Sequence, residues 1–589
     1  MKKVVLPVLL ALATILPLIS HAQSCPATGS NVVLVGTGTQ DKTTGFQITQ
    51  NTLWTRNNIY VLNGCIFVNS GATLTIESGT IIKGDQANQG TLVIRQGGRL
   101  EAVGTPTQPI VFTSNQPAGS RAPGDWGGII LCGRAPVNLP GNPTIEGGVN
   151  ATFGGTDPAD NSGTLQYVRI EYPGVAFQPN NEINGLTLGG VGYGTTIDHI
   201  QVTGSGDDSF EWFGGTVNAK YLIALAGTDD DFDTDNGFSG RVQYGLGLRN
   251  PGRGDTGSGG VSNGLESDND ATGTVNGPQT SAVFSNMTIL MPTTPTPSSP
   301  FNNSASALIR RNSAQSIFNS VFAGRRFGVE LNSNSANYTQ SNAQSGSLVL
   351  SNNVVSTSAF SATLTNRAGR STYGTGVTPL AGFNVNSIVA TGNDTTQAVA
   401  GLGLSADNFQ FDGNCANNRQ CVPNFPLPSA SILNAGAAFT NTKLTGAGNG
   451  GPNSTFDAVN FRGAFGASNT PAGNWATSWT NFNPQNTCYN VPGLTLSNKA
   501  AAEQIQSLSV APNPTEGAAK LSFELKKAGT VSVRVLDVTG REVAVVTKAV
   551  KLAAGTQVIQ LPASLNAGLY LASVTTDNGT QSVRFVVAK

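Results

Sequence analysis

Apolar and polar residues alternate in short runs near the beginning of the chain, and one of these runs is repeated. The segment 71–79 (GATLTIESG) is echoed by 89–97 (QGTLVIRQG), so that Leu74 matches Leu92, and the same offset continued once more reaches Ile110. Alternation with a period of two is typical of a strand that buries one face. Repetition at a fixed offset, with glycine at the corners, predicts a right-handed parallel β-helix in which successive coils stack. An antiparallel sandwich would also give short strands, but it has no reason to keep one offset.

Candidate strands continue through the middle of the chain. They cover residues 165–171, 183–188, 197–202, 221–225, 242–248, 283–290, 316–322 and 348–355. Residues 250–280 are rich in Gly, Asp and Asn, which predicts a long loop. We expect residues 360–490 to cap the solenoid, and the apolar plugs of its C-terminal end to be Trp475, Trp479 and Phe482, because an exposed end coil needs a cover. Stacking of these tryptophans on a glycan is the alternative.

The segment 1–22 has the features of a secretory signal. Lys2 and Lys3 precede an apolar run from Val4 to Ile19, and small residues stand at the cleavage positions Ser20 and Ala22. A membrane anchor is the alternative, but an apolar run of about 16 residues with two prolines is shorter than the roughly 20 that a span needs. No later apolar run is long enough to span a bilayer. We therefore expect a mature chain without a transmembrane segment, with the β-helix domain at 23–490.

Composition and cysteine usage narrow the classes of function. Charged residues make up 11% of the chain, and 33 basic residues nearly balance 34 acidic ones. Nucleic-acid binding needs a basic footprint that this balance lacks, so we expect no nucleic-acid partner. Six cysteines fit an oxidising compartment, and the short spacing of Cys415 and Cys421 predicts a local disulfide, whereas the pairing of the other four stays open. His199 is the only histidine of the predicted mature chain, which disfavours a zinc site or a Cys–His nucleophile.

Acidic residues gather in the middle of the predicted solenoid. The segments 203–210 (TGSGDDSF) and 225–232 (LAGTDDDF) align with each other, which stacks the pair Asp207 and Asp208 of one coil over Asp229 and Asp230 of the next. Adjacent strands lie roughly 4.8 Å apart, so carboxylates stacked at this distance repel unless they share a proton or a cation. Outside the cell we expect that cation to be calcium, which takes roughly six to eight oxygen ligands. The expected calcium ligands are Asp207, Asp208, Asp229, Asp230, Asp231, Asp233 and Asp235.

Other interpretations of these acidic residues stay open. Further members that would extend the cluster are Glu211, Glu266, Asp268 and Asp270. Without an ion, the same residues would form a solvated acidic face, and a pair of them would suit general acid–base catalysis. The segment 233–237 (DTDNG) superficially resembles an EF-hand loop, but Tyr244 stands where that loop ends on glutamate, so an EF-hand is excluded.

The character of the chain changes after a linker-like stretch at 491–504. Regular alternation over residues 505–589 predicts a small β-sandwich with strands at 521–525, 531–536, 557–561, 569–574 and 581–587. Three segments, 511–517 (APNPTEG), 536–543 (LDVTGREV) and 565–570 (LNAGLY), together with the terminal lysine, resemble the type A C-terminal sorting domain of the type IX secretion system. The matching residues are Pro512, Asn513, Pro514, Gly517, Gly540, Gly568 and Lys589.

This resemblance has one departure and several implications. Ala511 stands where the sorting family usually has an aromatic residue. The resemblance implies a bacterium of the Bacteroidetes type, handling by the type IX secretion machinery, and passage through the periplasm and outer membrane to the cell surface or the medium. An ordinary terminal adhesive sandwich is the alternative.

The solenoid also carries resemblances. The segments 124–130 (GDWGGII), 133–136 (GRAP), 211–215 (EWFGG) and 229–235 (DDDFDTD) resemble exported bacterial β-helix proteins over roughly residues 40–485. This likeness implies the fold and no particular chemistry.

The wider pectin-lyase-like group includes hydrolases with Asp-Asp and Asp-Thr-Asp motifs. Here these motifs stand in the reverse order, and the Gly-His-Gly motif of that group is missing. Lyases of the group pair calcium with a basic residue, for which Lys220, Arg241 and Arg249 are the candidates in this chain.

Three functions therefore remain open. We favour a calcium-stabilised binding or adhesive protein of the cell surface, with a surface polysaccharide as the candidate ligand and no assigned catalytic residue. The alternative is a carbohydrate-active enzyme, a lyase or a glycoside hydrolase, acting on an acidic polysaccharide. The third is a structural component of a surface layer or matrix. A groove lined by Asp235, Arg241 and aromatic side chains would favour the enzyme, and an acidic ridge with filled calcium sites would favour the binder.

Overall fold

The computed structural model describes most of the chain in two compact units. The described residues are 25, 31–178, 181–250, 252–255, 261–291, 300–358, 367–409, 423–467, 473, 475–494, 505–537, 542–576 and 579–588. The larger unit ends at Leu494, and the smaller one runs from Thr495 to Lys589. The expected signal at 1–22, the expected Cys415–Cys421 disulfide, Gly540 and Lys589 lie outside the described residues.

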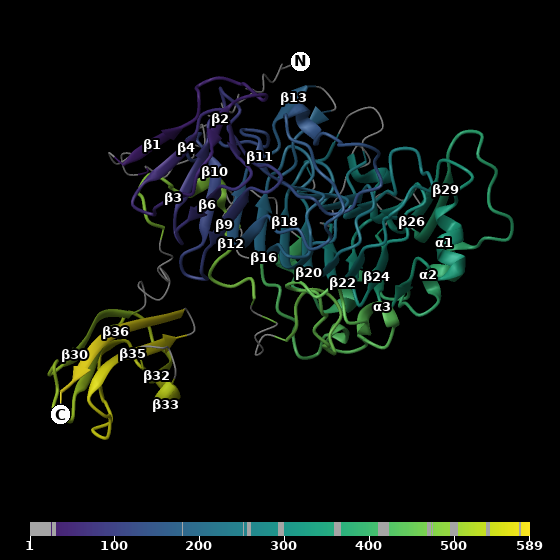
Figure 1. Ribbon diagram of the computed structural model, residues 1–589. Helices are drawn as coiled ribbons and strands as arrows, with labels where there is room; N and C mark the ends of the chain where they lie inside the picture. Colours follow the sequence, from purple (N-terminus) through teal and green to yellow (C-terminus); the bar gives the residue numbers. More distant parts are fainter. Residues whose placement is uncertain are drawn as a thin grey trace, which may run out of the picture. The chain divides into compact units, whose positions relative to one another are not determined.

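The larger unit is a parallel β-helix built from two long parallel sheets, as the sequence predicts (Figure 1). The first sheet has 16 strands, and its main path is β1 (Val32–Val35), β4 (Ile59–Leu62), β7 (Ile81–Gly84), β10 (Ile110–Ser114), β12 (Gly163–Glu171), β16 (Thr196–Thr203), β18 (Asn218–Leu225), β20 (Arg241–Leu248), β22 (Val283–Leu290), β24 (Ser316–Phe318) and β27 (Leu350–Ser351). Its side paths are β3 (Thr52–Trp54), β6 (Thr73–Ile76) and β9 (Arg99–Val103), and then β25 (Val321–Ala323) and β28 (Val354–Ser356).

The second sheet has 11 strands and one path. In order of pairing these are β2 (Phe46–Ile48), β5 (Cys65–Val68), β8 (Thr91–Ile94), β11 (Gly128–Cys132), β15 (Leu186–Gly189), β17 (Phe210–Phe213), β19 (Phe232–Asp235), β21 (Leu265–Ser267), β23 (Ala305–Ile309), β26 (Phe327–Ser333) and β29 (Arg367–Tyr373). The sequence missed β21, which lies inside the region expected to be a long loop, because so short a strand does not show alternation.

The stacking register differs from the one that the repeated segment suggests. Leu74 pairs with Leu100, and Leu92 pairs with Ile66 in the other sheet. The echo between 71–79 and 89–97 therefore matches strands of different sheets, and the expectation that these segments stack on each other is wrong. The physical reason is that every strand of the solenoid has the same alternation of buried and outward residues, so similar segments need not be neighbours.

A bend inside the first sheet repeats from coil to coil. In β12, residues 163–166 pair with β9 and residues 168–170 pair with β10, so two strands join at Tyr167. Tyr167 has a φ of 51°, in the left-handed region. Pairing aligns six more left-handed residues with it, in the order His199, Tyr221, Tyr244, Asn286, Asn319 and Asn352. We call these seven residues the corner ladder.

The side chains of the corner ladder stack on one another. The ring centroids of Tyr167 and His199 lie 4.4 Å apart, those of His199 and Tyr221 4.3 Å, and those of Tyr221 and Tyr244 5.0 Å. Stacked rings of this kind stabilise a fold beyond the area that they bury. Farther along, Asn319 takes the place of the rings and donates a hydrogen bond from Nδ2 to Ser285.

A segment from the end of the larger unit lies lengthwise over this corner. We call residues 423–494, as far as they are described, the strap. Its contacts move toward earlier coils as its sequence advances: Ala438 with Asn319, Asp457 with Lys220, Asn481 with Gln201 and Tyr489 with Glu171. A disulfide between Cys25 and Cys488 ties the strap to the beginning of the chain.

The strap corrects the expectation for its aromatic residues. Trp475 and Trp479 lie with their rings against His199, and Trp475 also packs on Tyr221. These tryptophans and Phe482 are buried. They therefore cover the side of the solenoid instead of plugging its C-terminal end, and buried rings cannot stack on a glycan. The last coil is covered by α2 (Val385–Ala390), whose Val385 and Val389 join the core.

The remaining short elements of the larger unit lie in the loops between its strands and in the segment that follows them. They are η1 (Glu146–Gly148), β13 (Ala176–Gln178), β14 (Asn181–Glu182), η2 (Pro300–Asn303), α1 (Thr339–Ser345), η3 (Val399–Leu402), η4 (Ala406–Phe409), η6 (Ile432–Asn434), α3 (Thr442–Thr445) and η8 (Pro484–Asn486). No helix among the described residues is long and apolar enough to cross a membrane.

The smaller unit is an antiparallel sandwich, as the sequence predicts. One sheet has three strands, β30 (Ile505–Ala511), β31 (Lys520–Leu525) and β34 (Gly555–Gln560). The other has four, β33 (Glu542–Leu552), β32 (Gly529–Asp537), β35 (Gly568–Thr576) and β36 (Gly579–Val587). Their inner faces share one core, in which Phe523 of the first sheet meets Val533 and Phe585 of the second.

We predict that Asn319→Ala lowers the free energy of unfolding by about 2–4 kcal/mol. Asn319 is fully buried; its Oδ1 accepts a hydrogen bond from Ala438 N at 2.9 Å, and its Nδ2 donates to Ala438 O at 3.2 Å. Removal of the side chain leaves both backbone groups of the strap unpaired, and alanine is strained at a φ of 52°. The measurement is chemical denaturation of the purified protein.

Asn352→Ala is the matched control, because Asn352 has a φ of 60° and, among the described residues, its side chain bonds only to Ser351. It should cost about 1 kcal/mol, which is the strain alone. Equal losses in the two variants would show that the strap gains nothing from its contact with the corner ladder.

Candidate metal centre

The acidic residues lie at matching positions of three adjacent strands of the second sheet. Pairing of β17 with β19 places Glu211 beside Asp233, and pairing of β19 with β21 places Asp233 beside Glu266. Phe210 and Trp212, which flank Glu211, point into the core. Since side chains alternate along a strand, the three carboxylates leave the sheet on its outer face. The alignment of the two Asp runs in the sequence is therefore the register of the structure.

The carboxylates form three overlapping groups. Within each group, one oxygen of every member lies within 4.8 Å of the others. The groups are Asp207–Asp208–Asp229, Asp208–Glu211–Asp233 and Asp230–Asp233–Glu266. We call these seven residues the acidic cluster. Because Asp208 and Asp233 each belong to two groups, the cluster is one continuous array of oxygen atoms.

Backbone and amide donors satisfy only part of the acidic cluster. Asp230 N donates to Asp208 Oδ1 at 2.7 Å, and Asn263 Nδ2 donates to Glu266 Oε2 at 3.0 Å. In contrast, Asp229 Oδ1 and Asp233 Oδ1 are buried and have no hydrogen-bond partner within the described part of the chain. A buried carboxylate oxygen without a partner is costly, so these two atoms lack a compensating donor, proton or cation.

Two arginines compensate one end of the cluster. Arg310 forms an ion pair with Glu266, and its Nε lies 2.9 Å from Asp268 Oδ1. Arg311 Nη1 lies 2.6 Å from Asp268 Oδ2. Asp268 is thus engaged by arginines, and the opposite end of the cluster, at Asp207 and Asp229, has no such ion pair among the described residues.

Three of the acidic residues singled out in the sequence have other surroundings. Asp231 forms a fully buried ion pair with Arg249, with 3.1 Å between Oδ1 and Nε. Asp235 Oδ1 accepts from Asn236 N at 2.6 Å, and Asp270 accepts from the backbone and hydroxyl groups of its own turn. The structure does not bring these three carboxylates into the groups that define the acidic cluster.

Burial and mutual repulsion raise the pKa values throughout this region. The pKa lies well above that of an ordinary carboxyl, first because of burial and then because of neighbouring carboxylates, for Asp207, Asp208, Glu211, Asp230 and Asp233. Burial also raises the pKa of Asp229 to about 6, of Glu266 to about 7 and of Asp235 to about 8. Without a cation, the folded protein therefore holds protons here that an unfolded chain releases.

The segment that contains η1, β13 and β14 adds two further carboxylates. Burial, followed by the charge of Glu182, raises the pKa of Glu146 to about 7, and hydrogen bonds to Asn184 and Glu211 lower it. Asn184 Nδ2 in turn donates to Glu211 Oε2. The sequence missed Glu146 and Glu182 because they lie far from the acidic run along the chain, and only the fold brings them near it.

Comparison with known families agrees with this architecture. Residues 45–480 match the pectate-lyase-like β-helix domain, and residues 509–588 match the secretion system C-terminal sorting domain. The chain belongs to the pectate-lyase-like β-helix family. Comparison with curated proteins gave no match. The sorting domain assigns the protein to the type IX route and indicates export to the cell surface or the extracellular space.

The basic residues that a lyase of the pectin-lyase-like group would need lie elsewhere in this β-helix. Lys220 and Arg241 belong to β18 and β20 of the first sheet, where Lys220 pairs with Asp457 and Arg241 donates to backbone oxygens of the strap. Arg249 is fully buried against Asp231. Asp235 and Arg241 are on different sheets, so they do not line one groove.

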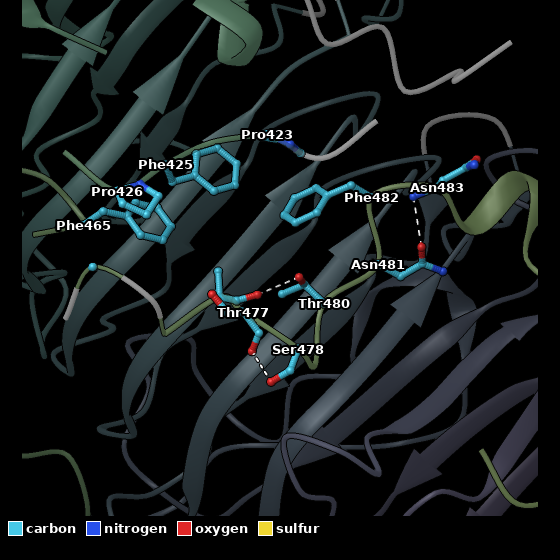
Figure 2. Close-up of a pocket in the computed structure, with 12 residues that line it drawn as sticks. Pro423, Phe425, Pro426, Phe465, Thr477, Ser478, Thr480, Asn481, Phe482 and Asn483 are labelled. Atoms are coloured by element: carbon cyan, nitrogen blue, oxygen red, sulfur yellow. Dashed lines mark hydrogen bonds between the residues drawn. The ribbon is translucent and has the colours of Figure 1, made fainter. Parts of the chain in front are cut away.

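A pocket of about 470 Å³ lies in the strap (Figure 2). Its apolar side is formed by Phe425, Phe465 and Phe482. Hydroxyl and amide side chains complete the lining, and none of the described lining residues is charged; the polar ones are Thr477, Ser478, Thr480, Asn481 and Asn483. This lining suits a neutral, hydroxyl-rich ligand better than an acidic one.

The sorting motif has a structural part in the smaller unit. Asn513 Oδ1 accepts from Val586 N at 2.9 Å, and Asn513 Nδ2 donates to Arg584 O at 3.2 Å. The Pro512–Pro514 segment thereby holds the last strand, β36, from the side. Gly568 begins β35, and Gly517 lies in the loop between β30 and β31.

We predict that, without divalent cations, the unfolding temperature falls by roughly 5 °C or more between pH 4 and pH 8. The folded-state pKa values of Asp229, Glu266 and Asp235 lie above the roughly 4 of an unfolded carboxyl. Their contribution to stability is complete below pH 4 and is lost as the pH rises through about 6 to 8. The measurement is calorimetry in EDTA across this range.

The variant Asp208→Asn/Asp230→Asn should flatten this pH dependence, because two of the repelling charges become neutral amides of the same shape. A stability that stays level or rises from pH 4 to pH 8 in the unchanged protein would contradict the prediction.

Proposed function

We propose that this protein is a calcium-stabilised β-helix that serves at the cell surface as a binding or adhesive protein. The observation that supports the proposal is the acidic cluster, seven carboxylates in coil-to-coil register with buried oxygens of Asp229 and Asp233 left without partners in the described part of the chain. Repulsion at this spacing is removed by protons or by a cation, and outside the cell a divalent cation would take the place of the protons.

Calcium suits these ligands better than other common cations. The cluster offers only carboxylate oxygens, which are hard ligands, and calcium accepts many of them in flexible geometry. Zinc prefers nitrogen and sulfur, and magnesium demands a stricter octahedron. The three overlapping groups would allow one ion at each end of the cluster, with Asp208 and Asp233 as shared ligands.

Burial favours a stabilising role for the cluster over a catalytic one. Asp208, Asp230, Glu211 and Glu266 are all buried. Arg310, which forms an ion pair with Glu266, has its pKa raised by Glu266 and Asp268 against the effect of its own burial, so it stays charged and cannot take a proton from a substrate. An ion bound here would cross-link adjacent coils through their carboxylates and so stabilise them.

The ligand that we propose is a surface polysaccharide, and the pocket of Figure 2 offers suitable chemistry. Phe425 and Phe482 line its apolar part, and Thr477 and Asn483 offer hydroxyl and amide groups for hydrogen bonds to sugar hydroxyls. The strap that forms this pocket is fixed to the corner ladder and by the disulfide at Cys488, so the pocket is preformed.

We predict that millimolar calcium raises the unfolding temperature of the purified protein at pH 7.5. Binding to the folded state alone stabilises by about 4 kcal/mol when the free ion is about a thousand times its dissociation constant. The measurement is calorimetry in EDTA and in calcium, repeated with Asp208→Asn/Asp230→Asn, in which the shift should vanish.

The matched control is Asp85→Asn/Asp157→Asn, which removes two charges outside the cluster and should keep the calcium response of the unchanged protein. A calcium response that survives in the cluster variant would refute the ion site. Release of unsaturated products from an acidic polysaccharide would instead favour the lyase alternative, and we expect none.

A further inference from the structure

Part of one face of the smaller unit is apolar, although nothing in the described part of that unit covers it. On the four-stranded sheet, pairing puts Leu569 opposite Val586 and Leu571 opposite Leu536. Residues directly opposite in an antiparallel sheet share a face, and so do residues two apart in one strand. Val545 joins them because it stands opposite Arg534, two residues before Leu536.

We call this surface the open face. Its apolar members are Leu536, Val545, Leu569, Leu571 and Val586, its basic members are Arg534 and Arg584, and Ser573 and Ser582 continue the same face as a polar part. The exposed fractions are 50% for Val545, 43% for Leu569 and 37% for Val586. A contiguous group of exposed apolar residues of this kind marks an interaction site.

The outer face of the other sheet makes a clear contrast. Lys520, Ser522 and Glu524 of β31 alternate with buried residues, and Thr556, Val558 and Gln560 of β34 lie beside them. The apolar residues that the pairing puts on that face are Ala511 and Val558. The two sheets share one core and fold together, so the difference between their outer faces does not arise from folding alone.

Charge and motif position indicate the partner. Residues 505–589 contain nine Lys and Arg against five Asp and Glu, whereas the whole chain has 33 against 34. A basic domain that carries Arg584 beside apolar residues complements a partner whose apolar surface is rimmed by carboxylates. Two of the segments that resemble sorting motifs, 536–543 and 565–570, also reach the open face at Leu536 and Leu569.

We propose that the open face is the surface by which the sorting domain docks on a component of the type IX export machinery, whose own surface is apolar with an acidic rim. Docking would bury Leu569 and Val586 and pair Arg584 with a carboxylate of the partner. This assignment is independent of the calcium site and of the ligand of the β-helix.

The test compares substitutions on the two faces in the full chain, expressed in a bacterium that has the type IX system. Val586→Thr and Leu569→Thr/Val586→Thr alter the open face, and Val558→Thr makes the same change on the opposite face. Arg584→Glu and Lys520→Glu are the matched pair for charge. The readouts are the periplasmic and exported fractions of the protein and the unfolding temperature of each variant.

We expect the double variant and Arg584→Glu to lower the exported fraction relative to the periplasmic one by roughly tenfold, as loss of central contacts in an interface does. Val558→Thr and Lys520→Glu should be exported like the unchanged chain, with all unfolding temperatures alike. Equal export of all variants would overturn the proposal, as would equal retention of both members of a pair. Unchanged export with a shifted unfolding temperature, or with altered size in solution, would instead mean that the open face covers the chain itself or a second copy.

Discussion

The hydrogen-bond ladder between successive coils is the constraint on which the β-helix depends. In a parallel sheet, each residue pairs with one residue of the coil before and one of the coil after, at a spacing of roughly 4.8 Å. A side chain therefore stacks on its equivalents whether or not they attract. The same rule gives a favourable result at one corner of this protein and an unfavourable one on its second sheet.

At the corner, stacking is favourable because the residues are aromatic rings and amides. Tyr167, His199, Tyr221 and Tyr244 pile face to face, and the strap places Trp475 and Trp479 against their edges. The left-handed backbone of these residues costs free energy at each step. Ring stacking and the cover of the strap offset that cost, so the bend, the ladder and the strap form one mutually dependent structure.

On the second sheet, stacking is unfavourable because the residues are carboxylates. Glu211, Asp233 and Glu266 are in register, and burial prevents water from screening them. The backbone ladder is strong enough to hold them together, and the penalty appears as raised pKa values. Carboxylates that the backbone already holds in place would be preorganised for a cation, because their side chains lose little conformational entropy when an ion binds.

Much of this protein follows from its sequence alone. Alternation and glycine corners indicated the early strands and the later strands of the first sheet but not those of the second sheet from β17 onward, while the matching Asp runs gave the register of the acidic coils and the motifs from Ala511 onward indicated the sorting domain. These features are local, because each depends on a few consecutive residues and can be predicted from the two-residue period of a strand.

The tertiary structure decided which strands are neighbours and which residues far apart in the sequence come into contact. Leu74 pairs with Leu100 instead of matching Leu92, Asp231 meets Arg249, Glu146 approaches Glu211, and Cys25 is bonded to Cys488. In each case a loop or longer segment separates the two partners, and the alternation of apolar and polar residues does not specify where that segment brings the chain. Alternation fixes whether a side chain points inward or outward, but only the packed coils and strap determine which residue it meets there.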